Sequence, residues 1–110
     1  MAYSESLAQR IRSALARQRG IAEKKMFGGV GFLLHGNMLV GIWKTSLIVR
    51  LAPEAAKAAL KQSNVVPFDI TGRPMKGWVM VEPDGIETDE QLADWIRQSQ
   101  DFVCTLPRKQ

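Results

Sequence analysis

The stretch from residue 24 to residue 42 constrains the fold most, because short apolar runs alternate there with glycines. Residues 30–34 and 38–43 have the length and composition of β-strands. They flank His35-Gly36-Asn37, which predicts a three-residue hairpin loop with a glycine available for a positive φ. Phe27-Gly28-Gly29 is typical of a bend or bulge, since glycine accepts backbone angles that other residues resist. The stretch therefore predicts an antiparallel β-meander.

Further strands are predicted on both sides of this hairpin. A short strand covers residues 23–26, and a tight turn at Lys44-Thr45 leads into another at residues 46–51. Residues 78–81 have high β propensity. Residues 65–74 contain two prolines and a glycine, which favours a loop with a brief extended piece.

Three helices complete the predicted fold. Ser4 can cap the first, Pro53 can begin the second, and Thr88 with Gln91 forms a capping-box pattern for the third. Apolar residues at helical or alternating spacing predict the core: Leu7, Ile11, Ala14, Leu15, Val79, Val81, Leu92, Trp95, Ile96, Phe102 and Val103. We expect an α+β two-layer sandwich, an antiparallel β-meander sheet with helices packed on one face, and with Trp78 and Trp95 in one core.

Length and cysteine content limit the class of protein. The 110 residues suit one domain, residues 1–110. The single cysteine, Cys104, cannot form an intrachain disulfide. The first residues predict a polar helix without the apolar segment of a signal peptide, and no apolar run is long enough to cross a bilayer. We therefore expect a cytoplasmic protein that makes no membrane contact.

The net charge of +4 is unevenly distributed along the chain. Residues 1–81 hold twelve Lys or Arg against four acidic residues, whereas residues 82–101 hold seven acidic residues against one arginine. Such asymmetry can steer partners or favour complementary self-association. It is equally compatible with two solvated faces that segregate by chance.

Residues able to carry chemistry are scarce. A metal site needs three or four suitable ligands, and the chain has one histidine, His35, and one cysteine. The glycines at Gly28, Gly29 and Gly31 do not fit a phosphate-binding loop, because a strand rather than a helix N-terminus follows them. The acidic residues near the last helix have a structural reason to lie at its start. The sequence predicts no enzyme, no metal and no cofactor.

A basic array remains as a candidate contact surface for nucleic acid or a protein partner: Arg10, Arg12, Arg17, Arg19, Lys24 and Lys25. Phosphates attract such arrays, but no recognised DNA-docking element is present. Sheet-type RNA readers expose aromatic side chains. Phe27, Phe32, Trp43 and Trp78 are candidates, although aromatic residues at strand spacing more often belong to a core. Weak nucleic-acid binding is therefore kept as an alternative.

One group of residues follows a family pattern in both order and spacing: Met26, Phe27, Gly28, Gly29, Gly31, Gly36, Gly77, Trp78 and Trp95. Their order resembles the TfoX (Sxy) N-terminal domain family of bacterial competence regulators. The resemblance implies an antiparallel sheet backed by helices, similar to secretion chaperones, in a class that often dimerises. It also implies assistance to a cyclic-AMP-responsive transcriptional activator. Full-length regulators of the family carry a second, C-terminal helical domain, whereas this sequence resembles a stand-alone N-terminal domain.

Three functions therefore stay open. The first is a non-enzymatic regulatory domain that acts through a protein partner, in transcription or competence (DNA transformation), with a homodimer ranked slightly ahead of a monomer. The second is a weak nucleic-acid-binding module that uses the basic first helix. The third is a small ligand-binding protein with a pocket between sheet and helices.

Overall fold

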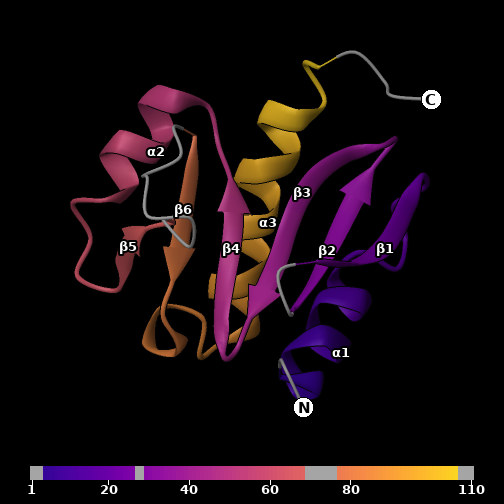
Figure 1. Ribbon diagram of the computed structural model, residues 1–110, viewed down its shortest axis with the longest axis horizontal. Coiled ribbons are helices and arrows are strands. Elements are labelled where there is room, and N and C mark those ends of the chain that lie inside the picture. Colours follow the sequence, from indigo (N-terminus) through magenta and orange to yellow (C-terminus); the bar gives the residue numbers. More distant parts are fainter. Residues whose placement is uncertain (1–3, 27–28, 69–76, 107–110) are drawn as a thin grey trace.

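The computed structural model describes residues 4–26, 29–68 and 77–106. Figure 1 shows one open sheet with helices packed against it. In chain order the elements are α1 (Glu5–Ala14), β1 (Ile21–Met26), β2 (Gly29–Leu34), β3 (Asn37–Trp43), β4 (Ser46–Arg50), α2 (Pro53–Ala59), β5 (Val65–Pro67), β6 (Trp78–Val81), the 3-10 helix η1 (Pro83–Gly85) and α3 (Asp89–Val103).

The sheet has six antiparallel strands in the order β1-β2-β3-β4-β6-β5. The first four form the predicted meander, and β6 then adds to β4 with β5 at the far edge. Helix α3 crosses behind β3 and β4 in Figure 1 and contacts α1 beside it. The α+β fold expected from the sequence is thus confirmed.

The turn between β2 and β3 is shorter than predicted. Leu34 pairs with Asn37, so the loop has two residues, His35 and Gly36, and not three. Both have positive φ angles, 51° and 86°. This is the type of two-residue turn whose twist matches that of an antiparallel hairpin, and glycine adopts its second position without strain. The predicted tight turn at Lys44-Thr45 is confirmed, since Trp43 pairs with Ser46.

A β-bulge lies between β2 and β3. The register shifts between Phe32, which pairs with Val40, and Leu33, which pairs with Met38. Leu39 is therefore the extra residue on β3. Its carbonyl oxygen accepts a 2.7 Å hydrogen bond from the hydroxyl of buried Ser99 on α3. The predicted bend or bulge at Phe27-Gly28-Gly29 is a separate position; its first two residues lie outside the described part, and Gly29 begins β2.

Strand register assigns the residues of the sheet to two faces. The face toward the helices, here called the core face, carries apolar side chains that are at most 5% exposed: Val30, Phe32, Val40, Ile42, Leu47, Val49, Val65, Val79 and Val81. Side chains from all three helices join them in one cluster. The predicted core is confirmed apart from two residues. Phe102 is only partly buried and packs against the cluster. Ala14 is exposed, because it lies off the stripe formed by Leu7, Ile11 and Leu15.

The opposite side, here called the outer face, carries a second set of residues: Ala22, Lys24, Gly31, Leu33, Met38, Gly41, Trp43, Ser46, Ile48, Arg50, Val66, Trp78 and Met80. None of them belongs to the core cluster. Trp95 lies in that cluster, with 6% of its surface exposed. Trp78 faces outward and packs against Phe68, with ring centroids 6.0 Å apart. The prediction that both tryptophans share one core is therefore wrong.

Each helix begins where the local sequence predicts. The Ser4 hydroxyl accepts a hydrogen bond from the Leu7 amide, Pro53 opens α2, and the Thr88–Gln91 capping box is complete. Helix α1 ends at Ala14 and α2 at Ala59. No described helix is long and apolar enough to cross a membrane.

Candidate functional site

The six basic residues of the predicted array do not form one free cationic surface. Arg10 and Arg12 lie on α1, Arg17 and Arg19 in the connection to β1, and two lysines on β1 itself. Within the described chain, only the first two of these residues make ion pairs. The array therefore divides into two paired and four unpaired residues.

Arg12 is held by two acidic side chains. Its guanidinium donates to both carboxylate oxygens of Glu23 at 2.8 Å and to Glu5 at 3.0 Å. The hydrogen bonds from Arg12 lower the pKa of the Glu23 carboxyl below its ordinary value of 4.5. The hydrogen bonds to Glu23 and Glu5 raise the pKa of Arg12 further. Much of the donor capacity of this guanidinium is thus satisfied within the chain, between α1 and the edge strand β1.

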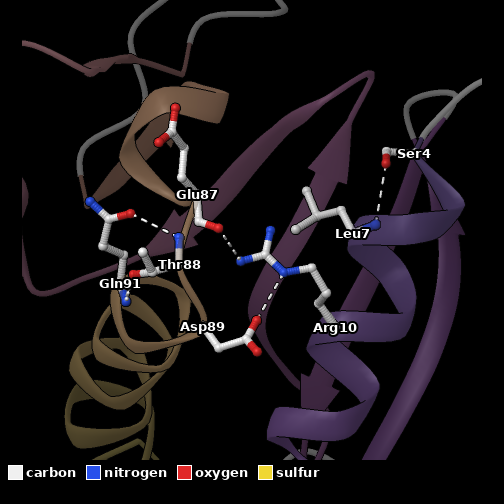
Figure 2. A network of polar contacts seen from close by, with 7 residues as sticks. All are labelled: Ser4, Leu7, Arg10, Glu87, Thr88, Asp89 and Gln91. Atoms are coloured by element: carbon white, nitrogen blue, oxygen red, sulfur yellow. Dashed lines mark hydrogen bonds and ion pairs between the residues drawn. The ribbon is translucent and has the colours of Figure 1, made fainter.

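Arg10 joins the first helix to the last one (Figure 2). Its Nε donates to Asp89 at 3.1 Å and its Nη2 to the carbonyl oxygen of Glu87 at 3.4 Å. Asp89 begins α3, beside the Thr88–Gln91 capping box. Because the Asp89 side chain is 91% exposed, the pair is worth at most about 1 kcal/mol. It nevertheless joins the basic and the acidic segment of the sequence inside one molecule.

Lys24 and Lys25 are exposed neighbours on β1 that point to opposite faces. Lys24 pairs with Gly31 and so belongs to the outer face, whereas Lys25 pairs with Val30 on the core face. Arg17 and Arg19 are exposed as well. These four residues form no ion pair with the described chain, so they remain available to an anionic partner.

The structure brings no catalytic or metal-binding cluster together in the described chain. No group of three or more His, Cys, Asp or Glu residues lies close enough to hold a metal ion there. His35 sits in the β2–β3 turn, where its amide donates to the Gly20 carbonyl oxygen. Cys104 follows α3 and is exposed.

Among the described residues, one cavity lies beside the first half of α3 and another lies at the start of α1. One, of about 230 Å³, is lined by polar side chains including Asn64, Gln91, Asp94 and Gln98, with Trp95 at its wall. Arg97 and Gln98 hydrogen-bond the Asp94 carboxylate, and the bond from Arg97 is the main cause of its lowered pKa. The other, of about 180 Å³, adjoins Arg10. Both are smaller than the roughly 300–1,000 Å³ typical of ligand pockets.

Two glycines of the family pattern, Gly36 and Gly77, lie where the backbone has a positive φ. Gly77 has a φ of 81°, and its carbonyl oxygen accepts from the Leu51 amide at 2.7 Å. A Cβ at Gly77 would lie 2.8 Å from the Leu51 carbonyl oxygen, so glycine is required at this junction of β4 and β6. Met26 ends β1, Gly36 completes the β2–β3 turn, and Phe27 and Gly28 lie outside the described residues.

The sequence matches the profile of one known protein family. The TfoX N-terminal domain profile matches residues 13–103, most of the 110-residue sequence. The chain belongs to the TfoX N-terminal domain family. No curated protein and no solved structure matched it. Membership of this family supports a competence-related regulatory role, and the family is not known for enzymatic activity.

Sequence reasoning missed a set of cation–aromatic contacts near the outer face. The Lys44 ammonium lies 4.7 Å from the ring centroid of Trp43. The Arg50 guanidinium lies 5.6 Å from the ring of Trp78 and 5.8 Å from that of Phe102 on α3. The adjacency of Trp43 and Lys44 was visible in the sequence. The pairing of Arg50 with Trp78 depends on the register of β4 and β6, which only the fold supplies.

Proposed function

We propose that this chain is a non-enzymatic regulatory domain of the competence type, which acts by binding a protein partner, a cyclic-AMP-responsive transcriptional activator. The family match over residues 13–103 is the observation that carries the proposal. The chemistry of the described residues is compatible with it, because exposed charges are plentiful while candidate nucleophile–base pairs are not. A protein partner needs a surface and no reaction centre.

Charge suggests how such a partner would be recognised. The start of α3 presents the exposed acidic side chains of Glu87 and Glu90, and the α1–β1 connection presents Arg17 and Arg19. Complementary potentials raise association rates and fix the orientation of a complex. One of these two patches is therefore the expected contact region.

The direct test uses the purified chain and the cyclic-AMP-responsive activator of the same organism, with calorimetry as the readout. We expect a dissociation constant in the micromolar range or below for the wild-type chain. Two double variants each reverse the charge of one patch: one carries Arg17→Glu and Arg19→Glu, and the other carries Glu87→Lys and Glu90→Lys. One of them should bind the activator at least about tenfold more weakly, a loss of about 1.4 kcal/mol of binding free energy. The other should bind within about twofold of the wild-type affinity.

Two results would contradict the proposal. One is the absence of binding at activator concentrations 100-fold above the expected dissociation constant, both with and without cyclic AMP. The other is unchanged transcription of DNA-uptake genes when the gene for this chain is deleted from its host.

Self-association is part of the same proposal. The sheet leaves two edges, β1 and β5, and open strand edges must be blunted or paired. β5 has three residues and ends in Pro67, which lacks an amide hydrogen, so β1 with its six residues is the better edge for a two-fold contact. Sedimentation at micromolar concentration should give twice the monomer mass of 12.3 kDa. A single species at the monomer mass would refute the homodimer.

A further inference from the structure

The charges on the outer face are all of one sign in the described residues. Its strand positions carry Lys24 and Arg50 and no acidic residue. Lys44, in the turn after β3, is exposed beside them. The one acidic residue of β1, Glu23, points to the core face and binds Arg12. A surface of this kind attracts a polyanion.

Aromatic rings accompany these charges. Trp43 and Trp78 each keep part of their surface exposed, in contrast to Phe32 on the core face, which is 1% exposed. Both tryptophans already contact a cation, Lys44 and Arg50 respectively. A flat ring with a neighbouring cation matches the base and the phosphate of a nucleotide.

The middle of the outer face is low and apolar. One row of paired residues crosses the sheet from Lys24 through Gly31, Gly41 and Ile48 to Met80. The two facing glycines leave no side chain above β2 and β3 in this row. The terminal methyl group of Met38 lies beside Gly41, within 2.8 Å of where a Cβ would stand. The Met38 side chain therefore lies across Gly41, and Ile48 beside it is only 3% exposed, so the row between Lys24 and Met80 is lined by small and apolar groups.

We propose that the outer face binds single-stranded nucleic acid. Bases stack on Trp43 and Trp78, and phosphates pair with Lys24, Lys44 and Arg50. Along the strand direction, the positions of Trp43 and Trp78 differ by four residues of β4, about 13 Å. Across the sheet, the two tryptophans are two strand spacings apart, about 10 Å. Non-adjacent bases of one strand can therefore occupy the two rings. This surface is distinct from the paired arginines of α1.

A second copy of the chain fits the outer face less well. A two-fold contact there would bring the positive charges of one subunit toward those of the other, with no described acidic residue to compensate them. Duplex DNA fits less well too, because no described element projects from this face to enter a groove. A flat sheet with aromatic platforms is the arrangement that single strands use.

The test measures the binding of fluorescein-labelled 12-residue oligouridylate and oligothymidylate to the full chain by anisotropy at low salt. Adjacent lysines provide matched variants with the same charge change on opposite faces. Lys24→Glu should weaken binding at least about tenfold, whereas Lys25→Glu should change it less than about threefold. Trp43→Leu keeps an apolar side chain but removes the stacking platform, and should weaken binding roughly fivefold or more.

The remaining measurements separate the alternatives. Thermal melts establish that each variant is folded, and affinity should fall steeply with added salt. Equal losses of affinity for Lys24→Glu and Lys25→Glu would overturn the proposal. A loss of affinity seen only in a variant with both Arg17→Glu and Arg19→Glu would also overturn it, because binding would then belong to the α1 region. A dissociation constant above about 100 μM for both oligonucleotides would overturn it as well. So would a dimer that Trp43→Leu converts to monomer, because a second copy would then cover this face.

Discussion

The two faces of the sheet are built by the same strands, yet they differ in nearly every physical property. The core face is packed with branched apolar side chains from β2 to β6, which are almost fully buried. The outer face carries two adjacent glycines, two tryptophans and cationic side chains, and many of its residues stay partly exposed. Strand alternation separates the two sets, and the helices decide which set becomes the core. Stability therefore depends mainly on one face, and the proposed binding of nucleic acid belongs to the other.

The largest test of this difference compares two tryptophans. Trp95→Ala should lower the free energy of unfolding by about 3–5 kcal/mol, because it leaves a cavity in the helix–sheet core. Trp78→Ala should lower it by less than about 2 kcal/mol, since that ring is only partly removed from water. Urea melts of both variants give the comparison. Equal losses would mean that the outer face contributes to stability as much as the core does.

A smaller effect is expected for two serines. Ser99→Ala should destabilise the chain by about 1–3 kcal/mol, because the buried carbonyl oxygen of Leu39 loses its hydrogen bond at the bulge. Ser46→Ala, on the outer face, should stay within about 0.5 kcal/mol. The same denaturation measurement serves both. A Ser99→Ala variant as stable as the wild type would show that another donor replaces the hydroxyl.

The smallest effect concerns neighbours on β1. The pKa of Glu23 is lower in the folded chain than its ordinary 4.5, so the stability it contributes is present above about pH 4.5 and is lost as the pH falls through the folded value. The Arg12 and Glu23 side chains are 32% and 39% exposed, and solvent screening should keep the loss below about 1 kcal/mol. Glu23→Gln should flatten the acid limb of a stability–pH curve, and Lys24→Gln, on the other face, should not. An unchanged acid limb in Glu23→Gln would count against the ion pair.

Local sequence signals predicted the elements well. The caps at Ser4 and Thr88, the proline at the start of α2 and the Lys44-Thr45 turn depend on residues within a few positions of each other. Such short-range chemistry is complete in the sequence. The apolar stripe of α1 was also readable, apart from Ala14.

The assignment of faces was harder, and one error was avoidable. Trp78 and Val79 are adjacent in one strand, so alternation already places them on opposite faces, and both could not belong to one core. The contacts of Arg10 and Arg12 could not be foreseen, because their partners come from other elements: Asp89 is 79 residues away from Arg10 in the sequence. The contact between Arg50 and Trp78 likewise needs the register of two strands that α2 and β5 separate. Long-range placement is what the sequence pattern alone does not contain.

The extra residue at Leu39 also shifts the pairing register of the β2–β3 hairpin tip by one residue relative to the rest of the sheet. On one side of it Met38 and Asn37 pair with Leu33 and Leu34, and on the other side Val40 pairs with Phe32. Removing Leu39 itself would restore regular pairing and would leave Met38 on the outer face and Val40 on the core face. Removing a residue at another position of β3 would instead exchange inward and outward side chains on one side of the deletion. A single-residue deletion in β3 away from Leu39 should therefore do more damage than most point substitutions in the same strand. In a protein engineered from this chain, insertions and deletions belong outside β3.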